Sequence, residues 1–302
     1  MITIFAIPKP FQGHINTIQR NAIKSWTLLH PQVEVILFGN DEGTSDTATE
    51  FGIRHIPDIA RNEFGTPLLN SILDVAQAAA SHNIMVYVNA DIILMSDFIR
   101  AVQYIPKGPF LMTGQRWDVD LEKLIDYENN DWEDRLKTII NEKGKLSFRG
   151  AMDYFVFHRG LWKDIPSFAI GRTAWDNWLI YYARSMRIPV IDATEAVTAI
   201  HQNHETNHRP GHGLMLKGPE VERNLEIAGD GSKFSLDDAS LRLTSEGFKN
   251  PILTANRFYR SIESIPLLKP SLSPLAKFLL ILLDPLVKIR TSAWYLKMCR
   301  KG

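Results

Sequence analysis

The fold is predicted from residues 84–91, Ile84-Met85-Val86-Tyr87-Val88-Asn89-Ala90-Asp91. Five consecutive apolar residues of strand-forming type are typical of a strand that is buried on both faces of a parallel sheet. The apolar run stops at Asn89 and Asp91. In open α/β sheets, ligands bind outside the carboxyl ends of the strands. We therefore predict that Asp91 lies at a ligand site, where it binds a metal ion or a phosphate.

The segments before this stretch alternate between strand and helix patterns. Strands are predicted over residues 2–7, 33–38 and 53–56, and helices over residues 15–29, 45–51 and 68–82. Thr66 and Pro67 precede the last of these helices, and these residue types favour a helix N-cap and a first helical turn. Because strands and helices alternate, we predict an α/β fold with a central, mostly parallel sheet and helices on both faces.

The residues after Asp91 form a less regular pattern. Strands are predicted over residues 110–113, 154–157 and 190–200, helices over about residues 131–142 and 174–186, and a polar loop at Trp117 and Asp118. Residues 211–237 are rich in glycine and charge, which favours loops with one short helix. We therefore predict a first domain over residues 1–215, in two halves that meet between residues 114 and 115. An irregular extension over residues 216–264 follows.

The composition is that of an ordinary globular protein. Apolar residues make up 45% and charged residues 23%, and Lys+Arg and Asp+Glu are equal at 34 each. Equal charges give no general attraction to polyanions, so we predict no nucleic-acid partner. The single cysteine, Cys299, fits a reducing compartment. Residues 1–11 lack a basic leader, and we expect a cytoplasmic protein.

The chain ends in a basic and apolar tail over residues 265–302. It contains seven Lys or Arg and one acid, Asp284, among apolar runs such as residues 278–283. These runs are shorter than the ~20 residues that span a bilayer, and basic amphipathic segments lie at anionic membrane surfaces. We therefore predict peripheral contact with the cytoplasmic face of a membrane. The alternative is a helix that docks on the first domain.

Two polar segments follow predicted strands. Residues 39–43, Gly-Asn-Asp-Glu-Gly, come directly after the second strand. Their glycines permit a tight turn, and their acids accept hydrogen bonds from a ribose or a base. Asn89 and Asp91 come after the fourth strand. Either segment also fits an ordinary surface turn, in which Asx side chains bond their own backbone.

A glycine turn at Gly171 leads into an aromatic helix that holds Asp176. A helix N-terminus lowers the pKa of a carboxylate, whereas exclusion of water by the neighbouring tryptophans raises it. We predict that Asp176 is a catalytic carboxylate. The alternative is a capping box between Thr173 and Asp176, in which the acid only neutralises the helix end. Asp153 is a second catalytic candidate that orients an acceptor, or else a plain acid at a strand edge.

A histidine cluster follows the last predicted strand of the first domain. It consists of His201, His204, His208 and His212. Histidines alone do not define a zinc site, but a mixed shell with Asp91 as an oxygen donor suits Mn²⁺ or Mg²⁺. We predict Asp91, His201 and His204 as the metal ligands. The alternative is a loop of exposed polar histidines.

In their order and spacing, these four segments resemble those of the nucleotide-sugar-dependent glycosyltransferases of the GT-A fold, most closely the inverting enzymes related to family two. Residues 39–43 match the acidic turn that holds the nucleoside in those enzymes. Asn89 and Asp91 lie at the position of their Asp-x-Asp motif, which binds the divalent cation and the sugar diphosphate. Asp176 is similar to their catalytic base, and His201 or His204 to the histidine that completes the metal shell.

The resemblance implies a GT-A-like catalytic domain over residues 1–215, with a nucleotide-sugar half over residues 1–114 and an acceptor half over residues 115–215. It favours a UDP-sugar donor and a glycan or lipid-linked acceptor. A divalent cation, Mn²⁺ or Mg²⁺, would stabilise the diphosphate leaving group, and Asp176 would take the proton of the acceptor hydroxyl, with inversion at the sugar. The implied nucleotide-sugar contacts are Pro8, Asn40, Asp41, Asn70, Asn89, Asp91 and Arg172.

The chain departs from the family pattern at two places, and two other functions stay open. Asn89 replaces the first acid of the motif, and Pro8-Lys9-Pro10-Phe11 replaces the usual end of the first strand. A non-catalytic carbohydrate or membrane-surface binding protein would explain Asn89. A sugar nucleotidyltransferase would need a glycine-rich, basic loop after the first strand, whereas residues 8–14 hold one glycine and one lysine.

Overall fold

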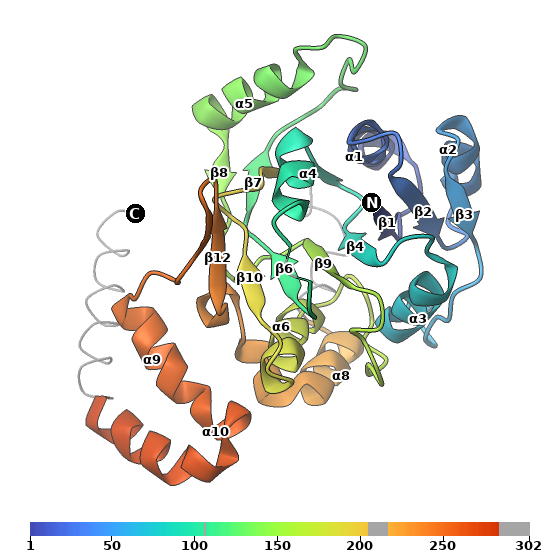
Figure 1. Ribbon diagram of the computed structural model, residues 1–302. Coiled ribbons are helices and arrows are strands. Elements are labelled where there is room, and N and C mark those ends of the chain that lie inside the picture. The colour runs from blue at the N-terminus through green and yellow to red at the C-terminus, as the bar shows by residue number, and fades with distance from the viewer. Residues whose placement is uncertain (106, 205–216, 284–302) are drawn as a thin grey trace, which may run out of the picture. The chain divides into compact units, whose positions relative to one another are not determined.

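The computed structural model describes residues 1–105, 107–204 and 217–283 (Figure 1). The chain divides into two compact units, Met1–Asn250 and Pro251–Gly302. The first unit therefore continues past residue 215, where the sequence pattern placed a domain boundary. It does so because two strands after that residue join the sheet of the first unit.

A nine-stranded sheet forms the centre of the first unit, in the order β13-β12-β10-β6-β9-β4-β1-β2-β3 (Figure 1). Every strand except β9 and β13 runs in the same direction. The carboxyl ends of the parallel strands therefore lie at one edge, and the predicted α/β fold with a mostly parallel sheet is confirmed. The strands are β1 Ile2–Ala6, β2 Glu34–Phe38, β3 Arg54–Ile56, β4 Ile84–Val88, β6 Leu111–Thr113, β9 Tyr154–His158, β10 Val190–Asp192, β12 Leu241–Thr244 and β13 Gly247–Lys249.

Helices cover both faces of this sheet. β1, β2 and β3 step outward in order, and the chain then returns to β4 on the other side of β1. Because crossovers between parallel strands are right-handed, α3 lies on the face opposite to α1 and α2. The helices of the first unit are α1 Gly13–Leu28, α2 Thr44–Glu50, α3 Leu69–Ala79, α4 Ser96–Val102, α5 Trp132–Lys143, α6 Trp175–Ser185 and α8 Pro219–Ala228.

Successive residues of β4 point to opposite faces of the sheet, as the pleat of a strand requires. Val86 packs in one core cluster with Trp26 of α1. Tyr87 points the other way and lies edge to face against Phe5, with ring centroids 5.8 Å apart. Tyr87 also meets Trp175 of α6, at 5.4 Å between centroids. A mixed aliphatic and aromatic core therefore covers one face of β4, and an aromatic cluster that includes Phe5 and Trp175 covers the other.

A second sheet has four short strands in the order β5-β11-β7-β8. They are β5 Ile92–Ile93, β7 Arg116–Val119, β8 Lys145–Leu146 and β11 Ala199–Gln202. Since β5 begins directly after Asp91, the chain passes from the large sheet to the small one at that carboxylate. The buried Trp26 side chain donates its indole N–H to the carbonyl of Ile92 at 2.9 Å and fixes this passage against α1.

Two predictions about strands are wrong. Residues 190–200 form β10 and β11, which belong to different sheets, rather than one strand. They separate because the chain turns between them, where the N–H of Ala196 donates to the carbonyl of Ala193 at 2.9 Å. Trp117 and Asp118 lie in β7 rather than in a loop, because β7 pairs with both β11 and β8.

The predicted N-cap of α3 is also wrong. Its N-cap is Leu68 rather than Thr66. Pro67 lies before the helix because it pairs with Arg61 in an isolated β-bridge. This bridge, together with one between Leu68 and Ala169, holds the segment before α3 in an extended conformation.

The second unit is helical in its described part. It contains α9 Ala255–Glu263, α10 Ile265–Leu268 and the 3₁₀ turn η3 Pro270–Leu272, followed by helical residues 273–283. Within the described residues, no helix has the length and apolar character that a membrane crossing requires. The predicted tail beyond residue 283 lies outside the described residues.

Candidate metal centre

Three potential metal ligands meet where the chain leaves the large sheet. Asp91, His201 and His204 each offer one ligand atom, and these atoms lie within 4.8 Å of one another. His204 Nε2 is 3.3 Å from Asp91 Oδ2, and His201 Nε2 is 3.7 Å from the same oxygen. The structure therefore brings together residues that are far apart in the sequence.

Strand pairing explains why His201 faces Asp91. β11 pairs antiparallel with β5, and His201 lies opposite Ile92, the residue after Asp91. The buried Gln202 side chain fastens the same junction, because its Nε2 donates to the carbonyl of Asp91 at 3.1 Å and to that of Ile18 in α1 at 2.7 Å. The backbone at Asp91 is thus held against β11 and α1.

Electrostatics keep Asp91 ionised. Burial by itself raises the pKa of this carboxyl. The hydrogen bond with His204 and the positive charges of His201 and Lys9 outweigh burial and hold the pKa of Asp91 well below its ordinary value. An ionised carboxylate is the form that binds a cation.

Asp118 and Arg116 of β7 support His201 from the side away from Asp91. In the parallel pairing of β7 and β11, Asp118 lies opposite His201, and its Oδ1 is 3.1 Å from His201 Nδ1. Arg116 donates to Asp118 at 2.9 Å and also contacts Asp153. Metal-binding histidines commonly have their second ring nitrogen next to a carboxylate, which orients the ring. The sequence did not predict Asp118 as a partner of His201, nor Arg116 as a partner of Asp118.

Asn89 and Asp153 form a second pair beside the cluster. Asn89 Nδ2 donates to Asp153 Oδ1 at 2.5 Å, and the hydroxyl of Tyr87 donates to Asn89 Oδ1 at 3.1 Å. The other oxygen of Asp153 contacts Arg116. Both oxygens of Asp153 are therefore engaged by protein groups, and so are both ends of the Asn89 amide.

Asp176 lies at the start of α6 with an unusual pKa. Burial of its carboxyl raises the pKa to about 7, and the negative charge of Asp153 adds to this, against opposing backbone N–H groups. The N-cap is Ala174, which has a left-handed φ of 87° and makes no side-chain capping bond. The capping box between Thr173 and Asp176, which was the alternative to a catalytic role, is thus absent, because Ala174 occupies the cap position.

Tyr87 lies near three acidic residues of this region. Burial raises the pKa of its hydroxyl, and the negative charges of Asp153, Asp91 and Asp176 raise it further. All three carboxylates therefore lie near the end of β4.

The predicted nucleoside turn packs against the loop that follows β1. Gly43 has a φ of 81°, and a Cβ there would lie 2.7 Å from Cβ of Phe11, so only glycine permits this approach. Asp41 Oδ2 accepts from Arg61 at 2.5 Å, while Asn40 is exposed and Pro8 is buried. Nucleoside binding by these residues stays a prediction.

The two remaining predicted contacts differ in their surroundings. Arg172 donates to Glu220 Oε2 of α8 at 2.6 and 2.9 Å, so its guanidinium already has an anionic partner. Asn70, in the first turn of α3, has a buried Oδ1 that finds no hydrogen-bond partner in the described part of the chain. Their contact with a sugar diphosphate stays a prediction. His208 and His212 lie outside the described residues.

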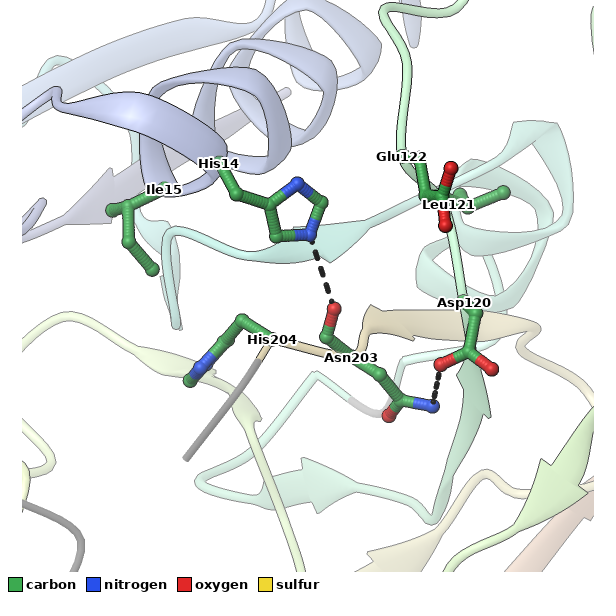
Figure 2. A pocket seen from close by; sticks show the side chains of 7 residues that line it. All are labelled: His14, Ile15, Asp120, Leu121, Glu122, Asn203 and His204. Atoms are coloured by element: carbon green, nitrogen blue, oxygen red, sulfur yellow. Dashed lines mark hydrogen bonds between the residues drawn. The ribbon is translucent and has the colours of Figure 1, made fainter. Parts of the chain in front are cut away.

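A cavity of about 550 Å³ opens beside His204. Figure 2 shows its lining side chains, which come from the start of α1, the loop after β7 and the residues that follow β11. His14 Nε2 is 3.2 Å from the carbonyl of Asn203, and Asn203 Nδ2 donates to Asp120 at 2.9 Å. Because His204 lies in the wall, a molecule in this cavity would lie next to the three-residue cluster. The lining residues are His14, Ile15, Asp120, Leu121, Glu122, Asn203 and His204.

The cluster has the chemistry of a divalent-cation site. One carboxylate and two imidazoles converge, and such a mixed oxygen and nitrogen set suits Mn²⁺ among divalent cations. Asp91 Oδ1 is buried and has no hydrogen-bond partner among the described residues. A buried acceptor without a partner is costly, and a bound cation would satisfy it.

No protein-family model matches the sequence. No curated protein matches it either.

The chain is similar in structure to glucosyl-3-phosphoglycerate synthase from Mycobacterium tuberculosis, solved with Mg²⁺ and uridine diphosphate, at a TM-score of 0.43 and 15% identity over 78% of this chain and 80% of that one. It is also similar to mannosyltransferase PcManGT from Pyrobaculum calidifontis, solved with GDP-Man and Mn²⁺, at 0.42 and 12% identity over 70% and 59% of the two chains. A likeness at this level assigns no activity to the chain.

Proposed function

We propose that this protein is a glycosyltransferase that moves a sugar from a nucleoside-diphosphate donor to a hydroxyl acceptor. The observation that carries the proposal is the convergence of Asp91, His201 and His204 at the carboxyl edge of a mostly parallel sheet. Asp176, a carboxyl with a pKa of about 7, follows Trp175, whose ring lies 5.4 Å from that of Tyr87 between centroids. Asp176 therefore lies near the end of β4, the strand that leads to Asp91. The cluster would hold a cation for the leaving diphosphate, and Asp176 would be a base for the acceptor hydroxyl. Transfer of a sugar with inversion uses both groups.

Asp91, His201 and His204 would hold Mn²⁺ or Mg²⁺. When bound, the cation would supply positive charge to the diphosphate leaving group, whose negative charge grows as the bond to the sugar breaks. Lys9 would add to this, because its charge already acts on Asp91 from the loop after β1. Asn70 offers its unpartnered Oδ1 to a donor hydroxyl.

Asp176 would act as the general base. A carboxyl with a pKa of about 7 is largely ionised slightly above neutral pH, yet it is basic enough to accept a proton from a hydroxyl in the transition state. The proton of the acceptor hydroxyl moves to the Asp176 carboxylate, while the acceptor oxygen attacks the anomeric carbon from the face opposite to the leaving diphosphate. The sugar is transferred with inversion.

The finer assignments follow the motif resemblance. We propose a UDP-sugar as the donor, with its nucleoside held at Pro8, Asn40 and Asp41, and a glycan or lipid-linked acceptor. Because sugar nucleotides are made in the cytoplasm, we place the protein there.

One observation favours a second candidate function, a binding protein that has kept the fold without the chemistry. Asn89 stands where the resemblance predicts an acid, and its amide is engaged by Asp153 and Tyr87 at both ends. Such a protein would bind a nucleotide or a carbohydrate and transfer nothing.

The test combines ligand binding with transfer. Thermal unfolding is recorded with UDP-, GDP-, CDP- and dTDP-sugars, with and without Mn²⁺, because a ligand at 100 times its Kd adds ~2.7 kcal/mol to stability. Release of nucleoside diphosphate is then measured for the wild type and for Asp176→Asn. We expect this variant to keep Mn²⁺-dependent donor binding and to lose ~10²–10⁴-fold in transfer. Donor binding without transfer by the wild type would establish the binding protein instead.

Asp91→Asn tests the metal site, and His30→Ala serves as its control. His30 follows the far end of α1, a helix that begins next to the cavity and whose 16 residues span ~24 Å. We expect Asp91→Asn to abolish the Mn²⁺-dependent increase in melting temperature and His30→Ala to retain it.

A further inference from the structure

The second unit ends its described part in a helix that is apolar on both faces. In residues 273–283, Ala276 is fully buried, and Leu279, Leu280 and Leu283 are partly buried at helical spacing from it. These residues form the inner face of the helix, which packs within the protein. A helix that is apolar all round normally has a second apolar surface against it.

The outer face of the same helix has no cover among the described residues. Leu275, Phe278, Ile281 and Leu282 are 57%, 59%, 70% and 56% exposed. They lie at i, i+3, i+6 and i+7, which places them on one side of the helix. We name these four residues the outer stripe. Contiguous exposed apolar surface of this kind marks an interaction site.

Charge identifies the partner. Residues 251–283 contain four basic residues, Arg257, Arg260, Lys269 and Lys277, and one acid, Glu263. Glu263 pairs with Arg260 at 2.6 Å. Lys269 and Lys277 are exposed, and Lys277 lies within the helix that carries the outer stripe. An apolar stripe beside basic residues fits the interface of an anionic bilayer, where apolar side chains enter the acyl boundary and cations meet the headgroups.

Further exposed apolar residues of the second unit agree with this partner. Ile252 and Leu253 are 63% and 75% exposed, and Phe258 of α9 is 49% exposed. In the sequence alone, residues 284–302 continue the same composition, with five basic residues, one acid, and Trp294 and Tyr295. Tryptophan and tyrosine prefer the membrane–water interface.

We propose that the outer stripe, together with Lys269 and Lys277, binds the surface of an anionic phospholipid bilayer. The stripe lies in the plane of the interface and does not cross the membrane. This role is independent of the proposed transfer reaction, since it uses none of the residues of the metal centre.

The test uses the full-length protein and sedimentation with vesicles of phosphatidylcholine, alone or mixed with phosphatidylglycerol. We expect binding to the mixed vesicles, and much weaker binding when ionic strength rises to about 1 M, where the screening length falls to ~3 Å. The variant L275Q/I281Q should reduce the partition coefficient at least ~10-fold. The matched control F64Q/M186Q replaces two exposed apolar residues of the first unit, which are 58% and 59% exposed, and should bind as the wild type does.

A charge variant and two further measurements complete the design. K269Q/K277Q should reduce binding to the mixed vesicles and leave the melting temperature unchanged, so the proposal stays testable if L275Q/I281Q does not fold. Equal sedimentation of the wild type and of both variants overturns the proposal. A wild-type dimer that L275Q/I281Q converts to a monomer, with vesicle binding unaltered, shows that a second copy covers the stripe. A lower melting temperature of L275Q/I281Q, with vesicle binding unaltered, shows that the chain itself covers it.

Discussion

Asp91 and Asp176 are carboxyl groups whose pKa values move in opposite directions. Both are affected by burial, which raises the pKa of each. Only Asp91 has cationic neighbours that reverse the effect, namely His201, His204 and Lys9. Two acids whose environments separate their pKa values can take two roles at one pH. In this protein, Asp91 is suited to hold a cation and Asp176 to accept a proton.

The pKa of Asp176 predicts the pH dependence of the proposed reaction. The base must be ionised, and below its pKa of about 7 the ionised fraction falls ~10-fold for each pH unit. We expect kcat/KM for transfer to rise with pH up to about 7 and then to level off. A rate profile at saturating Mn²⁺ measures this, and a flat profile between about pH 5 and pH 7 would contradict the role of Asp176.

The same shift predicts an effect on stability. Because the pKa of Asp176 is raised in the folded state from 3.8 to about 7, the folded protein binds the proton more tightly than the unfolded chain. The stability from this group is complete below about pH 4 and is lost as pH rises through about 7. We expect Asp176→Asn to be less destabilised than the wild type on going from pH 5 to pH 8. Urea unfolding at both values tests it, and parallel changes in the two proteins would refute it.

Asp118 is predicted to position His201 as a metal ligand. Asp118→Asn removes the carboxylate next to His201 Nδ1, and loss of such a group typically lowers metal affinity 10–100-fold. Calorimetric titration with Mn²⁺ measures the change. Asp134→Asn is the control, since the Asp134 side chain is 81% exposed. Unaltered Mn²⁺ affinity in Asp118→Asn would leave this aspartate with only a structural role.

Single residues were predictable where a long apolar strand ended at a polar group. Asp91 follows such a strand, and the structure brings it together with His201 and His204, although metal binding itself stays a prediction. Arg116 and Asp118 were not predictable as supporting residues. They lie in the four-residue strand β7, and their neighbours are set by pairing with β11 rather than by any local pattern.

At the scale of elements, the long strands and helices of the first ninety residues were predictable because their periodicity is strong. The short strands of the small sheet were not, since β5 and β8 have two residues each and show no alternation. The separation of β10 from β11 was missed for a related reason. Both are β-prone, and only tertiary pairing assigns them to different sheets.

Helix α8 fixes the segment that leads into α6. Its buried Asn224 accepts from the N–H of Ala169 at 2.9 Å, and its Nδ2 donates to the carbonyls of Ala169 and Thr173 at 3.0 and 3.2 Å. These bonds satisfy backbone groups shortly before Asp176. The helix that was expected to be part of an irregular extension thus supports the start of α6.

Asn224→Ala is therefore expected to destabilise the protein by ~1–3 kcal/mol, because it leaves buried backbone groups without partners. It should also lower the rate of transfer, since the segment before Asp176 loses its support. Glu226→Ala, an exposed change on the same helix, is the control. Denaturant unfolding and transfer assays on both variants check the prediction, and equal stability of the two would refute it.

At the scale of the whole molecule, the two proposed roles, metal binding and membrane binding, belong to different compact units. The metal centre lies entirely within Met1–Asn250 and the outer stripe within Pro251–Gly302. The boundary at Asn250 was not predictable from composition, because the glycine-rich and charged residues after 215 look like a linker. β12 and β13, which follow them, instead extend the large sheet.

Removal of residues 251–302 is expected to separate the two proposed roles. The shortened chain keeps the complete nine-stranded sheet and should unfold cooperatively, bind Mn²⁺ with the affinity of the full protein and no longer sediment with anionic vesicles. Circular dichroism, titration and sedimentation measure these three properties. Loss of Mn²⁺ binding in a folded shortened chain would show that the second unit contributes to the metal centre.

The passage of the chain from β4 to β5 at Asp91 has a consequence for the mechanical coupling of the two sheets. β5 has only two residues with which to pair to β11. A metal ion bound by both Asp91 and His201 would therefore cross-link these two short strands. Like any cross-link, it would close a long loop and restrict the unfolded chain. A chelator would remove this cross-link, and the small sheet would then be the first part of the first unit to exchange its amide hydrogens with solvent.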